Sequence, residues 1–131
     1  IIVHVNDESM ARQCVVEWPE AASELTKAFW PGPLTLVLAK AETIPDNVTA
    51  GGTTVGVRWP SHPFMQDLIN TCRFPLAAPS ANLSNHVSPT SAEHVKSQMD
   101  GRIPLIVDGG PTSVGIESTV VDLSGDRVIT L

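Results

Sequence analysis

LTLVLA, residues 34–39, decides the fold, because this apolar run starts directly after a strong turn signal. The turn is WPGP, residues 30–33, whose prolines and glycine end the helical pattern of the preceding residues. A short apolar run bounded in this way predicts a buried strand. We therefore place a strand at 34–39 in the interior of the protein.

Further strands and helices alternate on both sides of this stretch. IIVHV, VGVRW and PLAA have the composition of strands, and STVVDLS and RVITL, joined through GD, have that of a hairpin. This alternation predicts an α/β fold with a layered sheet, which the closing hairpin makes mixed. The expected strands are 1–5, 34–39, 55–59, 75–78 and the start of 103–110; the expected helices are 8–16, 19–29, 62–72 and 91–99, with a loop at 40–54.

Length and charge limit the class of protein. The 131 residues, 42% of them hydrophobic, suit one globular domain, so we assign 1–131 to a single domain. The net charge is -6 and the eight lysines and arginines are scattered, which argues against binding nucleic acid through its phosphates. No apolar run is long enough to span a membrane. Cys14 and Cys72 lack metal-ligand spacing, so we expect reduced thiols in a cytoplasmic protein.

One loop is unusual in composition. From Pro75 to Ala92 there is no formally charged side chain, yet hydroxyl and amide groups are dense. The loop follows an apolar strand, and in open α/β sheets ligands usually bind beyond the strand ends. Hydroxyls, amides and backbone N–H groups hold phosphate and ribose oxygens. The alternative is a surface loop in which serine and proline only form turns and caps.

Three other segments each allow a functional and a purely structural interpretation. Arg58 ends an apolar strand, where it either grips a carboxylate or phosphate or reaches into solvent. The glycine-rich loop around 109–115 is either a lid or a long surface turn. His4 on its own strand is more often structural than functional. Phosphate loops of the GxxxxGK[ST] and GxGxxG types, the GxSxG motif and metal-spaced histidine pairs are absent from the sequence.

Four segments are informative when taken together: FWPGPLTLVL, VGVRWPSHP, PLAAPSANLSNHVSPTSAEHV and VDGGPTSVGIESTVVDLS. They resemble the YrdC-like family of threonylcarbamoyl-AMP synthases, and the resemblance runs through essentially all 131 residues in family order. It implies a twisted, open α/β sheet with a concave substrate cavity. It also implies condensation of L-threonine, bicarbonate and ATP to threonylcarbamoyl-AMP and pyrophosphate, with the product passed to a tRNA threonylcarbamoyl transferase complex.

The resemblance assigns two groups of site residues. Ser80 and Asn82 match the family's SxN pair beside the nucleotide phosphates, and Thr54 and Ser88 match positions that line the ATP site. Mg²⁺ would accompany ATP through phosphates and water, so its protein ligands stay unassigned. No side chain is expected to act as a nucleophile, because positioning by Ser80, Asn82 and Arg58 suffices for the chemistry.

The second group surrounds the amino acid. Arg58 matches the residue that grips the threonine carboxylate, and Ser118 matches one that contacts threonine across the pocket. The peptide at Ala78 borders the amino acid, and His4 matches a histidine in the family's LIVHV-like strand.

The sequence also departs from the family pattern. Its ends lie inside strand patterns, and the family's upstream basic KxR motif and a later basic position fall outside it. We therefore expect a partial domain that is inactive alone, because those cations would neutralise the triphosphate. Behind the synthase we rank an inactive nucleotide-binding paralogue, then a carbamoyl-transfer domain that uses carbamoyl phosphate and ATP, and last an RNA-binding module.

Overall fold

The computed structural model describes residues 1–115, 117–125 and 128–131. The chain forms two compact units. The first consists of Ile1–Ala78 together with Ser118–Leu131, and the second of Pro79–Glu117. The predicted single domain is therefore a sheet unit with a second unit inserted before its closing hairpin.

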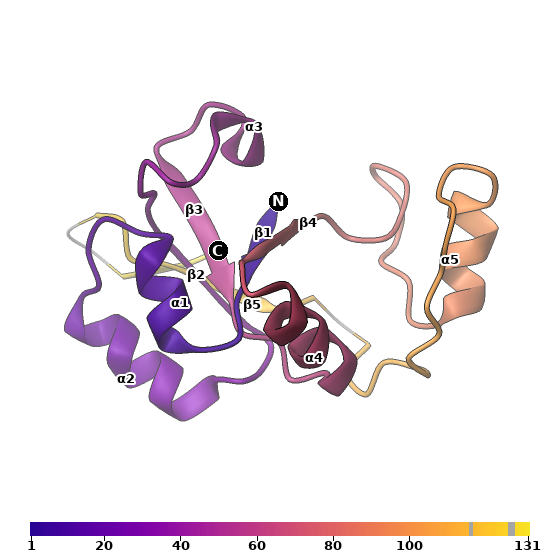
Figure 1. Ribbon diagram of the computed structural model, residues 1–131, viewed down its shortest axis with the longest axis horizontal. Coiled ribbons are helices and arrows are strands. Elements are labelled where there is room, and N and C mark those ends of the chain that lie inside the picture. Colours follow the sequence, from indigo (N-terminus) through magenta and orange to yellow (C-terminus); the bar gives the residue numbers. More distant parts are fainter. Residues whose placement is uncertain (116, 126–127) are drawn as a thin grey trace. The chain divides into compact units, whose positions relative to one another are not determined.

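A six-stranded mixed sheet forms the first unit, as the sequence predicted (Figure 1). Its strand order is β4-β1-β3-β2-β5-β6. The pairs β1–β3 and β2–β5 are parallel, and the other neighbouring pairs are antiparallel. The strands are β1 Ile2–His4, β2 Leu34–Ala39, β3 Thr54–Arg58, β4 Leu76–Ala78, β5 Thr119–Asp122 and β6 Ile129–Thr130.

The two faces of the sheet differ in burial. Directly paired residues such as Leu36 and Val57 point to the same face, because side chains alternate along a strand. We call the face of Leu36 the core face; its strand residues pack with Ala11 and Ala22 of two helices. The opposite face, which carries His4 and Arg58, is the open face, and most of its side chains are only half-buried. The buried strand residues of the core face are Val3, Leu34, Leu36, Leu38, Val55, Val57 and Val121.

The helices agree with the sequence in position but not in every detail. Residues 40–54 were expected to be a loop, yet a four-residue helix forms within them after Pro45. The Leu68 and Phe64 side chains of the fourth helix are exposed, while Ile69 is buried. The helices are α1 Glu8–Gln13, α2 Glu20–Phe29, α3 Asp46–Thr49, α4 Pro63–Cys72 and α5 Ala92–Met99.

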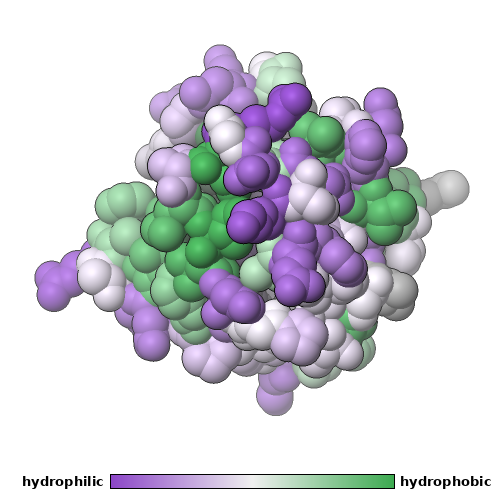
Figure 2. All heavy atoms as spheres, turned by 90° about the vertical axis from the view of Figure 1, so that its right-hand side faces the viewer, coloured by the Kyte–Doolittle hydropathy of each residue, from purple (hydrophilic) through white to green (hydrophobic). Residues whose placement is uncertain are grey.

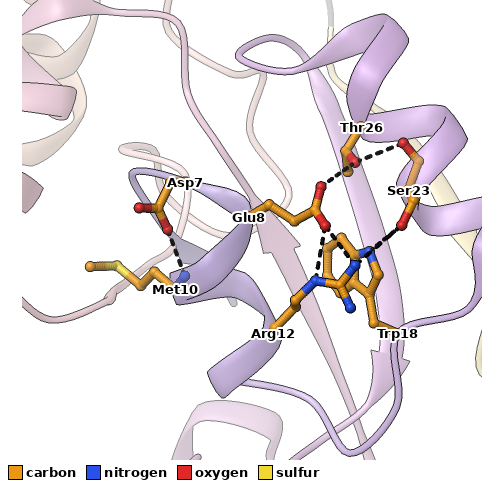
Figure 3. Close-up of polar contacts among 7 residues, drawn as sticks. All are labelled: Asp7, Glu8, Met10, Arg12, Trp18, Ser23 and Thr26. Carbon is orange, nitrogen blue, oxygen red and sulfur yellow. Dashed lines mark hydrogen bonds and ion pairs between the residues drawn. The ribbon is translucent and has the colours of Figure 1, made fainter.

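A polar network joins α1 to α2 (Figure 3). Arg12 donates to Glu8 Oε1 from Nε (2.9 Å) and Nη2 (2.6 Å), and its guanidinium lies 5.1 Å from the ring centre of Trp18. Trp18 Nε1 and Arg12 Nη2 both donate to Ser23 Oγ, at 3.0 and 3.3 Å. Thr26 Oγ1 donates to Glu8 Oε2 at 3.5 Å. These contacts fix the two helices relative to each other on the core face.

The WPGP turn connects α2 to β2 and is held at both ends. Trp30 Nε1 donates to the Leu34 carbonyl (2.8 Å), and the Gly32 N–H donates to the Trp59 carbonyl (2.9 Å). A Cβ at Gly32 would lie 2.3 Å from the Phe29 carbonyl oxygen, so this position requires glycine. The turn therefore starts β2 and also contacts the end of β3.

The second unit has no core of its own. None of its described residues is fully buried, and Val87, Leu105 and Val107 are exposed. Hydrophobic groups also lie between hydrophilic ones on the face drawn in Figure 2. The strand expected at the start of 103–110 is wrong, because no described strand pairs with this segment and an unpaired strand leaves its backbone groups unsatisfied.

The cysteines and the membrane prediction can be compared with the structure directly. Cys14 and Cys72 are free thiols, and Cys14 is fully buried. Burial raises the pKa of the Cys14 thiol to about 11, so it stays protonated. Within the described ranges, no helix has the length and apolar character needed to cross a bilayer.

Replacing Val57, which is fully buried on the core face, with alanine should lower the free energy of unfolding by about 2 kcal/mol, because two methyl groups leave a packed interior. Val37→Ala on the open face is the matched control and should cost clearly less, because Val37 is only half-buried. Urea denaturation of both variants measures the difference. Equal losses would contradict the assignment of the two faces.

Candidate functional site

His4 and Arg58 are neighbours at the ends of two parallel strands. They are directly paired in the register between β1 and β3, so both side chains lie on the open face. Each is only partly exposed. The family resemblance placed both residues near the amino acid, and the parallel register makes them direct neighbours.

The WPGP turn fixes the surroundings of Arg58. The Nε atom of Arg58 donates to the Gly32 carbonyl at 3.3 Å, and the Arg58 carbonyl accepts from the Val5 N–H at 3.0 Å. The guanidinium is therefore anchored at one nitrogen by a backbone oxygen, on the face away from the core. A guanidinium group can bind a carboxylate or phosphate through two parallel hydrogen bonds.

His4 is held in its neutral form. Burial lowers its pKa below 6.5; a backbone hydrogen bond at Leu76 opposes this shift, the positive charge of Arg58 adds to it, and a backbone contact at Ile2 opposes it slightly. Its Nδ1 atom is buried and has no hydrogen-bond partner of ordinary geometry among the described residues. Arg58 thus supplies the positive charge of this corner, and His4 supplies an uncharged ring.

Ser118 stands directly before β5. It lies at the same end of the strands as His4 and Arg58. The N–H of the next residue, Thr119, donates to the Pro33 carbonyl at 3.0 Å, which ties the start of β5 to the WPGP turn. The Ser118 hydroxyl lies 3.3 Å from the Thr35 hydroxyl of β2. Ser118 is therefore on the open face, directly before the strand that borders β2.

Thr54 and Ala78 lie on the open face, toward the strand ends opposite to those of His4 and Arg58. Ala78 pairs with Ile2, which pairs with Gly56 of β3. A hollow of about 360 Å³ occupies this part of the face, and Gly56 forms part of its floor. Its lining is mostly apolar and includes Thr54, Ile2, Thr35, Val37, Gly56, Val120 and the α3 residues Asn47–Thr49.

The other three predicted residues lie in the second unit. Asn82 Nδ2 donates to the carbonyls of His86 (2.7 Å) and Leu83 (3.2 Å), so this side chain closes the loop on itself. Ser88 donates to the Glu117 carboxylate. Ser80 is exposed. The structure thus divides the eight predicted residues into a group of five on the sheet and a group of three in the 79–117 unit.

Three further residues belong to these groups and were missed by the sequence reasoning. Thr35 was read only as part of an apolar strand, Gly56 only as a strand residue, and Glu117 only as part of a glycine-rich loop. The alternation of LTLVLA, which opposes Thr35 to the leucines, was the one signal that could have separated Thr35 from the core. Where the structure is described, no three His, Cys, Asp or Glu side chains cluster closely enough to hold a metal ion.

Comparisons with known proteins give consistent results. The Sua5/YciO/YrdC family model, described as "Telomere recombination", matches residues 1–131. The threonylcarbamoyl-AMP synthase of Bacillus subtilis is 49% identical over 132 residues, which cover 100% of this chain and 38% of that protein. The Pyrococcus abyssi enzyme of the same name is 48% identical, over 95% of this chain and 36% of its own length.

Solved structures agree with these relatives. The crystal structure of P. abyssi Sua5 complexed with L-threonine superposes with a TM-score of 0.95 at 47% identity, covering 99% of this chain and 38% of that one. Escherichia coli YciO shares the fold, with a TM-score of 0.88 at 24% identity over 99% of this chain and 63% of that one. The present chain thus spans 38% of the length of the B. subtilis synthase and 36% of the P. abyssi synthase. It belongs to the Sua5/YciO/YrdC family.

Proposed function

We propose that this chain forms the substrate-binding part of a threonylcarbamoyl-AMP synthase. The reaction would join L-threonine, bicarbonate and ATP into threonylcarbamoyl-AMP and release pyrophosphate. The observation that carries the proposal is the gathering of His4, Thr54, Arg58, Ala78 and Ser118 on the open face of the sheet. Relatives at 48–49% identity that are named as this synthase support it.

The positive charge of this corner suits the amino acid. In the proposed complex the Arg58 guanidinium binds the threonine carboxylate, since it is already anchored by the Gly32 carbonyl and loses little freedom on binding. The neutral His4 ring adds no second charge beside it. Ser118 offers a hydroxyl to the amino acid from the neighbouring part of the same face.

The chemistry needs positioning more than a protein nucleophile. The threonine amine forms a carbamate either by attacking carbon dioxide, which releases a proton, or by attacking bicarbonate, which releases water. A carbamate oxygen then attacks the α-phosphorus of ATP, and the bond to the β-phosphate breaks as pyrophosphate leaves. Holding the two substrates together supplies much of such a rate enhancement.

The uncharged loop of the second unit is the proposed nucleotide side. In this proposal Ser80, Asn82 and Ser88 offer hydroxyl and amide groups to the phosphates, and Thr54, which lines the hollow on the sheet, is assigned to ATP by the family resemblance. Mg²⁺ would enter with the triphosphate, bound mainly through phosphate and water oxygens. The product would pass to a tRNA threonylcarbamoyl transferase complex, and we propose a cytoplasmic location.

A carbamoyl-transfer domain is the second candidate, favoured by one observation. A crystal structure of full-length HypF in a phosphate- and nucleotide-bound form superposes on 98% of this chain with a TM-score of 0.71, although only 20% of residues are identical. This likeness establishes the shared fold. An enzyme of that kind would not require threonine, so the threonine dependence of turnover separates the two candidates.

Pyrophosphate release by the complete natural protein, measured with ATP and bicarbonate, should require L-threonine. Arg58→Ala should raise the KM for threonine roughly 10- to 100-fold, because a charge-assisted pair to the carboxylate is lost. The KM for ATP should change little. Arg73→Ala, which removes an exposed arginine after α4, is the control and should match the wild type. Release without threonine would point instead to carbamoyl transfer.

Ser80→Ala should weaken ATP binding by about 10- to 100-fold, because a hydrogen bond to a charged phosphate is lost. Ser84→Ala, in the same exposed loop, is the matched control and should bind ATP as the wild type does. Isothermal titration with a non-hydrolysable ATP analogue measures both. Unchanged affinity in Ser80→Ala would remove this residue from the nucleotide side.

Because the pKa of His4 is below 6.5 in the folded protein, the unfolded chain binds a proton that the folded chain does not once the pH falls below this value. The free energy of unfolding should therefore decrease as the pH is lowered from about 7 to about 5. His4→Gln should make this decrease shallower, whereas His86→Gln, at an exposed position, should not. Urea denaturation across the pH range tests this; identical slopes for both variants would contradict it.

A further inference from the structure

Thr35 carries a hydroxyl group that is buried in the centre of the sheet. Its exposed fraction is 1%, and it lies between Leu34 and Leu36, which face the core. A hydroxyl removed from water is costly unless it is hydrogen-bonded. In the part of the chain described here, the one hydrogen bond of the Thr35 side chain is the 3.3 Å contact with the Ser118 hydroxyl. This contact joins β2 to the residue that precedes β5.

The orientation of the Thr35 side chain is restricted on its other branch. Its Cγ2 methyl lies 3.2 Å from the position that a Cβ on Gly56 would occupy. The methyl group therefore rests over the glycine of β3, and a β-branched side chain has few χ1 rotamers. With the methyl group over Gly56, the hydroxyl is directed along the open face toward Ser118.

Thr35 also lies in the row of predicted ligand contacts. Leu36 pairs with Val57, so the preceding residue Thr35 stands opposite Arg58, which is itself paired with His4. Thr35 is more buried than either of these residues, and although it lines the hollow beside Thr54, its hydroxyl contacts Ser118.

We propose that Thr35 is a positioning residue that fixes the Ser118 hydroxyl for the amino acid substrate; this inference rests on the proposed function. A serine hydroxyl has one proton to donate and two lone pairs to accept with. The contact with Thr35 occupies one of these and stops the free rotation of the hydroxyl. The remaining hydrogen-bonding positions of the Ser118 hydroxyl point toward the amino acid, so the side chain loses less conformational freedom when the substrate binds.

Thr35→Val keeps the shape of the side chain but removes the hydroxyl, whereas Thr35→Ser keeps the hydroxyl. In the complete protein, Thr35→Val should weaken L-threonine binding about 3- to 10-fold, the effect of one neutral hydrogen bond. The kcat and the KM for ATP should stay within about twofold of the wild type. Thr35→Ser should retain most of the affinity.

Thr26→Val is the matched control, because Thr26 is a threonine of α2 with a 4% exposed fraction and makes its hydrogen bonds to Ser23 and Glu8. A double-mutant cycle adds a readout that a purely structural threonine would not move. In a Ser118→Ala background, Thr35→Val should have no further effect on threonine binding. Calorimetric titration of L-threonine measures every variant without requiring turnover.

The outcomes distinguish failure of the positioning role of Thr35 from failure of the proposed function. If the wild type binds threonine and Thr35→Val binds it equally well, or if the losses from Thr35→Val and Ser118→Ala add, the positioning role is wrong and the proposed function stands. If Thr26→Val weakens binding as much as Thr35→Val, the effect is structural and the positioning role is again wrong. If the wild type does not bind threonine at all, the proposed function fails and the role of Thr35 fails with it.

Discussion

The antiparallel pairing of β2 with β3 is the constraint on which the rest of this protein depends. It places Leu36 opposite Val57 on one face and Thr35 opposite Arg58 on the other. A shift of β2 by one residue would turn its leucines to the open face and Thr35 to the core. The helices α1 and α2 cover only the core face, and this keeps the register in place.

The WPGP turn shows how a local signal acts over a distance. It ends α2 and starts β2, and its backbone also contacts β3 through Trp59 and the start of β5 through Thr119. Two of the predicted contacts of the amino acid, Arg58 and Ser118, are therefore positioned by a turn in which neither lies. A rigid turn of this kind orders the site before any ligand arrives.

Much of this arrangement could be predicted from the sequence, because it depends on local patterns. LTLVLA gave the bounds of β2 without error, and Pro63–Cys72 is the helix that the spacing of apolar residues predicted. The segment at 103–110 has an equally apolar composition, yet its first residues form no strand. A strand requires a partner, and partners are a property of the whole fold.

The site shows the same limit. Ser80 and Asn82 stood out because hydroxyls and amides gather in one uncharged loop, whereas His4 and Ser118 were assigned only by family resemblance. Nothing local in the sequence announces that His4 is paired with Arg58, or that Thr35 contacts a residue more than eighty positions later. Register and strand order create these contacts, and both follow from long-range packing.

The alternation of faces also has an evolutionary consequence. Along β3, Val55 and Val57 are constrained by the volume of the interior, while Thr54, Gly56 and Arg58 are constrained by what lies against the open face. Neighbouring positions of β3 are thus under different constraints, so a substitution at one set of positions need not disturb the other set. A directed library that varies Thr54 and Arg58 and keeps Gly56 beneath the Thr35 methyl group would search for new ligands on an unaltered scaffold.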